Sequence, residues 1–198
     1  MNLELVNTLA TFGTFLVIAG TAIAALVQLR HARGSNQIAA LDELREAFQS
    51  REFAEANRFI DTQVTELVKD PEFRYQWANR AARTQRYAEA IEHIRLVGNY
   101  FEDFGALILA GLLDGELAVT IYCTDVVRAW DQLLPIVAIG RRRLGRGIWE
   151  NFEYAAMLSK RWMKDHPDGI YPRGEPRLEV NDVWLEADGQ YAASLAPA

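Results

Sequence analysis

The chain has 198 residues and a formal net charge of −6, and hydrophobic residues make up 50% of it. An acidic balance of this kind argues against an extensive nucleic-acid-binding surface, although it leaves room for local basic patches. The single cysteine, Cys123, excludes an intrachain disulfide and is typical of a reducing compartment.

The N-terminal stretch over residues 5–29 reads LVNTLATFGTFLVIAGTAIAALVQL and contains no charged residue. About 20 helical residues cross a bilayer core roughly 30 Å thick, so this stretch is long enough to span it. Glu4 precedes it without Lys or Arg, unlike the front of a signal peptide, whereas Arg30 and Arg33 follow it. By the positive-inside rule, we predict that residues 1–33 form a single-pass helix and basic flank in the bacterial inner membrane. The short N-terminus would lie outside and the remainder in the cytoplasm.

Within this stretch, polar side chains recur every seven residues. They are Asn7, Thr14, Thr21 and Gln28, with Ala10, Val17 and Ala24 between them and Gly13 and Gly20 alongside. A mild left-handed supercoil would keep this stripe on one side of the helix. Small residues permit close helix approach, and hydroxyl and amide groups can hydrogen-bond across it. The stripe therefore predicts either self-association of the spans or the lining of a central pore in a ring of parallel helices. The remaining alternative is a span without a partner.

The rest of the chain predicts an all-α fold. We expect a break or a helix cap at residues 34–36, further helices at helical apolar spacing, and a long helix from about Arg74 to Leu113. A following helix should be kinked at Pro135, and the last helix should stop at His166. These elements predict a cytoplasmic helical bundle over residues 34–166 and an extended C-terminal tail over residues 167–198.

Charged side chains suggest one binding patch. Arg141, Arg142, Arg143 and Arg146 form the densest basic cluster and predict a phosphate or lipid patch. The alternative is a solvated helix end whose cations suit the helix dipole. A second group, Arg80, Arg83 and Arg86, forms a stripe that we expect to pair with acidic residues. Glu102 and Asp103 lie in an apolar neighbourhood, where Arg95 or Arg128 are candidate partners.

No complete catalytic motif is present in the sequence. It has no phosphate loop, dinucleotide-binding glycine pattern, paired zinc cysteines or nucleophile-elbow serine. We therefore expect no cofactor, no metal and no small-molecule substrate, and a protein that is not an enzyme.

Several segments in fixed order resemble a family of uncharacterised bacterial single-span membrane proteins with a helical cytoplasmic domain. The matching pieces are SREFAEANRFI, VGNYFEDFGALILAGLLD, the helix around Trp130, the arginine run and WENFEYAAML. The family is a domain of unknown function, so the resemblance implies a fold and a topology but no activity. More distantly, the layout resembles the membrane accessory protein of RNA-targeting CRISPR systems. That likeness implies a divergent HEPN-type domain and a ring-shaped pore in antiviral defence.

HEPN ribonucleases carry an arginine followed by a polar residue and, after four to six residues, a histidine. Arg161 with His166, and Arg86 with His93, meet this spacing loosely, but Trp162 and Tyr87 replace the polar residue. A near-neutral imidazole could act as general acid or base while the arginine holds a phosphate. The ordinary alternative is that both histidines are structural, so we assign no catalytic residue.

We therefore expect a homo-oligomeric membrane protein that forms a pore or perturbs the bilayer in bacterial stress or phage defence. One alternative is a membrane-tethered HEPN-like module that binds or cleaves RNA, with an RNA or ribonucleoprotein partner. Another is a membrane-anchored scaffold for a protein partner.

Overall fold

The computed structural model describes residues 3–172 and 174–195, and side chains over 11–32, 34–172 and 174–194. This part of the chain contains helices and no strand, which confirms the all-α prediction. It divides into two compact units, Met1–Asp165 and His166–Ala198. The second unit contains α7 (Leu185–Leu195), a helix where the sequence predicted only extended chain.

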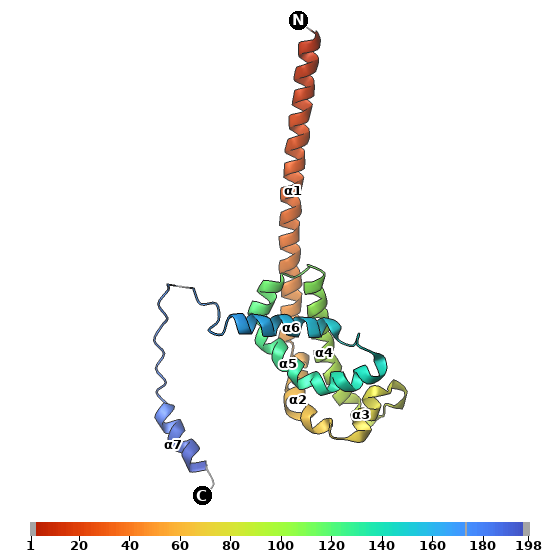
Figure 1. Cartoon of the computed structure of the whole chain (residues 1–198), viewed down its shortest axis with the longest axis vertical. Coiled ribbons are helices and arrows are strands. Elements are labelled where there is room, and N and C mark those ends of the chain that lie inside the picture. Colours follow the sequence, from red (N-terminus) through yellow and green to blue (C-terminus); the bar gives the residue numbers. More distant parts are fainter. Residues whose placement is uncertain (1–2, 173, 196–198) are drawn as a thin grey trace. The chain divides into compact units, whose positions relative to one another are not determined.

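Helix α1 (Leu3–Gln49) is uninterrupted from the apolar stretch to the bundle (Figure 1). The predicted break at residues 34–36 is therefore wrong. A glycine inside a helix costs only about 1 kcal/mol relative to alanine, and no proline is present there to stop the helix. Near the end of α1, Leu44 is buried, and Leu41 and Phe48 pack against the same core.

The bundle begins with α2 (Arg51–Leu67) and α3 (Pro71–Ala78), each started by a side-chain cap. The Ser50 hydroxyl oxygen accepts from the Phe53 N–H, and an Asp70 carboxylate oxygen accepts from the Glu72 N–H. Each cap satisfies a backbone donor that has no partner within its own helix.

Two 3₁₀ turns, η1 (Arg80–Ala82) and η2 (Gln85–Tyr87), separate α3 from α4 (Ala88–Leu109). The predicted helix from Arg74 to Leu113 is therefore wrong. Its interruption is held by the buried Gln76 side chain, which accepts hydrogen bonds from both the N–H and the hydroxyl of Thr84. These hydrogen bonds give the Thr84 N–H and the buried Gln76 side chain a partner, which favours the turn over a continuous helix.

The remaining bundle helices are α5 (Gly115–Leu144), which passes through Pro135, and α6 (Glu150–Asp165). Helix α4 packs against α2, α5 and α6. Its contact with α6 is close because Gly98 and Gly105 have no side chains. An added Cβ would lie 2.0 Å from the Trp149 ring at Gly98 and 2.0 Å from the Asn151 carbonyl oxygen at Gly105.

Trp149 is held on this α4 face just before α6. Its backbone has a φ of 50°, an uncommon conformation for a bulky residue. The ring is 7% exposed, and its indole N–H donates to the Asn99 side-chain oxygen at 3.1 Å. Packing and hydrogen bonding together stabilise a conformation that is unfavourable in isolation.

Candidate functional site

The apolar half of α1 is the first candidate site. It is the one helix in the described part of the chain that is long and apolar enough to cross a membrane, and none of its apolar window is buried. Its bulky side chains are exposed, among them Phe12, Phe15, Leu16, Ile18 and Ile23. A continuous exposed apolar surface of this kind marks a contact with lipid or with another protein.

The predicted stripe also lies uncovered on α1. Val17, Thr21, Ala24 and Gln28 are exposed, whereas the side chains of Asn7 and Ala10 lie outside the described residues. The Thr21 hydroxyl donates to the Val17 carbonyl oxygen at 2.8 Å, so its donor is satisfied within the helix. An added Cβ at Gly13 or Gly20 would meet no atom within 4 Å. No atom of the described residues therefore packs against this face at Gly13 or Gly20.

A group of aromatic rings joins α1 to the bundle. The Phe48 ring lies 5.1 Å from Phe53 and 5.4 Å from Tyr122, measured between centroids. The Tyr100 hydroxyl donates to the Leu44 carbonyl oxygen at 3.0 Å. Burial raises the pKa of Tyr100, so its hydroxyl stays protonated as a donor. The apolar segment is thus continuous with a helix that is fixed in the core.

The predicted basic patch at the end of α5 divides into two parts. Arg141 is half-buried and has a structural role, because it donates to the Ile148 carbonyl oxygen at 2.9 Å and pairs with Glu153 at 2.7 Å. It therefore holds the loop that leads into α6. Arg142, Arg143 and Arg146 are exposed and leave a smaller basic surface.

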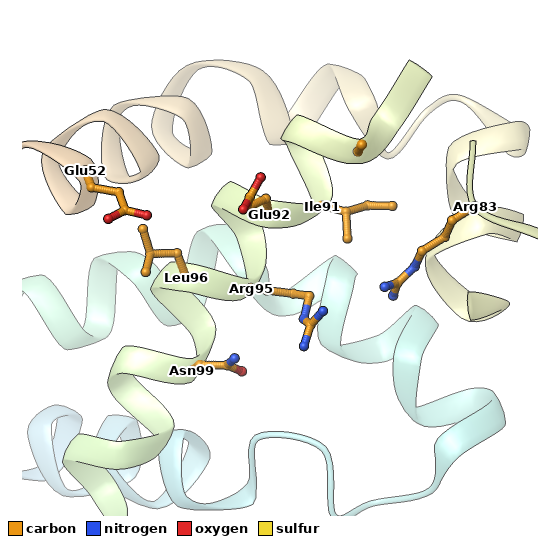
Figure 2. Close-up of a pocket in the computed structure, with 8 residues that line it drawn as sticks. Glu52, Arg83, Ile91, Glu92, Arg95, Leu96 and Asn99 are labelled. Carbon is orange, nitrogen blue, oxygen red and sulfur yellow. The ribbon is translucent and has the colours of Figure 1, made fainter. Parts of the chain in front are cut away.

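A second arginine group lines a hollow that the sequence did not predict as a site. Two adjoining cavities of about 430 and 280 Å³ share Arg83, Arg95 and Asn99 in their walls, and Arg80 lines the smaller one. We call this hollow the arginine pocket and define it by these four residues. In Figure 2 the Arg83 and Arg95 side chains, from the α3–α4 connection and from α4, extend toward the same space.

The arginine side chains of the arginine pocket have no acidic partner within ion-pair distance among the described residues. Arg80, Arg83 and Arg95 form no ion pair within 4.0 Å with any residue that the structure describes. The Arg83 Nε atom is buried and has no hydrogen-bond partner among the described residues. Burial lowers the pKa of Arg83, and the neighbouring charges of Arg95 and Arg80 lower it further. Arginine keeps its proton, so Arg83 stays positively charged. Burial and the two neighbouring arginines make that charge energetically unfavourable.

The expected pairing of the Arg80 group with acids therefore holds for one member. Arg86 pairs with Glu72 at 2.8 Å, and Asp70 lies at 3.7 Å. Helix periodicity did not separate Arg86 from the others, because Arg80 lies in η1, Arg83 follows η1 and Arg86 lies in η2, so the three do not share one α-helix.

Neither expected arginine partner binds Glu102. Its carboxylate accepts from the Asn151 side-chain amide at 2.8 Å and from the Phe152 N–H at 2.9 Å, at the start of α6. Arg128 instead pairs with Asp61 and Asp125, and Asp103 is exposed. The carboxylate of Glu102 thus caps α6, where a negative charge is favourable.

The HEPN-like candidates lie on different elements of the chain. Arg161 is exposed on α6 and donates to the Met157 sulfur at 3.3 Å, while His166 is exposed beyond the end of α6. His93 is half-buried on α4, with its ring 5.1 Å from that of Phe59. Among the described residues no group of three or more His, Cys, Asp or Glu is placed to hold a metal ion.

The fold and these sites define an all-α domain that continues directly from a helix whose length and composition would suffice to span a membrane. Residues 15–162 match the family model described as Domain of unknown function (DUF4760), and the chain belongs to that family. No curated protein and no solved structure matches the chain. The resemblance to an uncharacterised domain family is thereby confirmed. The match begins inside the apolar stretch and ends before His166.

Proposed function

We propose that this protein is a single-span protein of the bacterial inner membrane that assembles as a homo-oligomer through α1 and opens or perturbs the bilayer. The helical domain lies in the cytoplasm, because Arg30 and Arg33 follow the span directly. This activity would serve bacterial stress or phage defence.

The observation that carries the proposal is the continuity of α1 from Leu3 to Gln49. From Leu29 to Leu41 the helix rises about 18 Å without a flexible linker before it joins the core. A rotation or tilt of the domain is therefore transmitted to the span. A domain that was only tethered to a membrane would not need this rigid connection.

The surface of the span supports the mode of assembly. Gly13 and Gly20 leave open space for a neighbouring helix, and the Thr21 donor is already satisfied within α1. Small residues and internally bonded hydroxyls lower the cost of placing this face against another helix in lipid. The same face would line a water-filled opening if the ring were wide enough.

Cysteine cross-linking in membranes tests the assembly. We expect Thr14→Cys and Thr21→Cys to form disulfide-linked dimers on oxidation, because the stripe faces sister helices. Ala19→Cys, on the opposite side of α1, should not cross-link. The parent chain is the background control, since its one thiol, at Cys123, is buried. Equal cross-linking at positions 14, 19 and 21 would contradict the assigned face.

Dye efflux from vesicles tests the permeability. Replacing both Thr14 and Thr21 by leucine should abolish efflux and leave the oligomer intact, because bulk fills the opening without removing the glycines. Ala19→Leu, which adds the same kind of bulk to the other side, should leave efflux unchanged. Unchanged efflux in the double variant would refute the pore.

A further inference from the structure

We propose that the arginine pocket is a binding site for a small organic phosphate, with the phosphate held by Arg83 and Arg95 and assisted by Arg80 and Asn99. This inference depends only on the helical bundle and is independent of the function proposed for the span.

The first step is the contrast between Arg83 and the other half-buried arginines of the described bundle. Arg128 and Arg141 each pair with a carboxylate, and Arg74 donates to two backbone carbonyl oxygens. Arg83 forms no ion pair with a described residue, and neither does Arg95, which is exposed beside it. Two adjacent cations without counter-charges are unfavourable, and a bound anion would remove that cost.

The second step is the balance of donors and acceptors around the pocket. The Asn99 oxygen already accepts from the Trp149 indole, which directs the side-chain NH₂ of Asn99 away from that contact. Glu102 lines the smaller cavity, but both its oxygens accept hydrogen bonds from the start of α6. In the smaller cavity the remaining charged side chains are the guanidinium donors of Arg80, Arg83 and Arg95, whereas the carboxylates of Glu52 and Glu92 line only the larger cavity. A set of donors in a fixed geometry selects an acceptor-rich anion.

The third step concerns the kind of anion. Guanidinium groups suit the bidentate geometry of phosphate, and a phosphomonoester carries nearly two charges at neutral pH. The smaller cavity is also lined by apolar residues, Leu144, Ile148, Trp77 and Trp149. They offer a surface for an organic group beside the phosphate. The cavity of 430 Å³ falls at the lower end of the range for small-molecule sites, and the adjoining one of 280 Å³ lies just below that range.

The fourth step separates a compact ligand from a nucleic-acid strand. Glu52 and Glu92 line the larger cavity together with Arg83 and Arg95, and Glu52 lies at the opposite end of it from Arg83 (Figure 2). Two carboxylates there would repel the further phosphates of a continuing strand, whereas a single terminal phosphate can avoid them. The local charge pattern therefore favours a small phosphate over RNA.

Calorimetric titration of the full-length protein in detergent tests the site with three probes. They are inorganic phosphate, adenosine monophosphate and a single-stranded RNA oligonucleotide without terminal phosphates. We expect adenosine monophosphate to bind, inorganic phosphate to bind more weakly, and the oligonucleotide not to bind. Arg83→Gln and Arg95→Gln should each weaken binding of the monophosphate by about tenfold or more, because each removes charged hydrogen bonds. Arg58→Gln is the matched control, because it removes the same charge from an exposed position on α2. This variant should bind the monophosphate as the parent does.

Thermal unfolding without phosphate separates a ligand site from a structural role. In the ligand-free protein Arg83→Gln should unfold at the same temperature as the parent or above it, because it removes an unpaired cation. The monophosphate should raise the unfolding temperature of the parent but not of the variant. The proposal is overturned if none of the probes binds, if only the oligonucleotide binds, or if Arg83→Gln unfolds at a lower temperature than the parent.

Discussion

The hydroxyl of Tyr100, in the middle of α4, donates a hydrogen bond of 3.0 Å to the carbonyl oxygen of Leu44, near the end of α1. Leu44 and Tyr100 are separated by 56 residues in sequence, and both are buried. This bond and the rings around Phe48 join the apolar helix to the domain. A motion of the helical bundle would therefore be transmitted through these contacts to α1, and a motion of α1 to the bundle.

Replacing Tyr100 by phenylalanine should lower the free energy of unfolding by about 0.5–1.5 kcal/mol. The loss is modest because the Leu44 carbonyl remains inside α1 and can keep its helical hydrogen bond. Hydrogen exchange should become faster at residues 41–49. Tyr75→Phe is the control, since Tyr75 is 62% exposed, and should leave both measurements unchanged. Equal effects of the two changes would contradict a specific role for Tyr100.

Replacing Gly105 by alanine should destabilise the bundle by about 1–3 kcal/mol or more, because the new Cβ would lie 2.0 Å from the Asn151 carbonyl oxygen. The clash is with backbone, so α6 must move away from α4. Gly34→Ala, in open space on α1, should instead be neutral or stabilising by up to about 1 kcal/mol. Denaturant unfolding of the two variants measures the difference. A neutral Gly105→Ala would show that the α4–α6 contact is looser than described.

Replacing Glu102 by glutamine should cost about 1–3 kcal/mol, since one of its two acceptor oxygens becomes a donor that faces the start of α6. The neighbouring change Asp103→Asn, at an exposed position, should stay within about 0.5 kcal/mol of the parent. Denaturant midpoints of the two variants give the comparison. Similar losses for both would mean that the capping of α6 does not depend on Glu102.

The contact between Asp70 and Tyr87 should make stability depend on pH. The Tyr87 hydroxyl and the Glu72 N–H hydrogen-bond to the carboxylate and lower the pKa of Asp70 below its ordinary value of 3.8. The folded state therefore binds the Asp70 proton less readily than the unfolded chain does. This contribution is complete above pH 3.8 and is lost as the pH falls through the lower folded value.

The same hydrogen bond raises the pKa of Tyr87 to about 12, so its contribution is complete below pH 10.0 and is lost between pH 10.0 and about 12. Tyr87→Phe should reduce the loss of stability at both extremes. Unfolding midpoints of parent and variant, measured at neutral pH, below pH 3.8 and above pH 10.0, check this. Identical profiles would exclude Asp70 and Tyr87 as the source of the dependence.

Local sequence patterns predicted a helix correctly where apolar spacing, a cap or a proline within the segment gave a strong signal. In α2, Phe53, Ala56, Ile60 and Val64 recur in the sequence at helical spacing, and all four are buried. At the start of α3, Asp70 and Pro71 are residues that favour a helix N-terminus by capping and by proline geometry. The break near Gly34 and the continuous helix through residues 79–87 were wrong, because in each case the local signal was weak.

The sequence by itself determined that this protein is all-α and carries one helix apolar and long enough to cross a membrane, since both depend on periodicity and composition along a single segment. Only the tertiary structure decided which charges are neutralised. Arg128 meets Asp61 and Arg141 meets Glu153, whereas Arg83 and Arg95 meet no acid among the described residues. Arg128 and Asp61 are 67 residues apart in the sequence, and no local pattern records which distant charges the fold brings together.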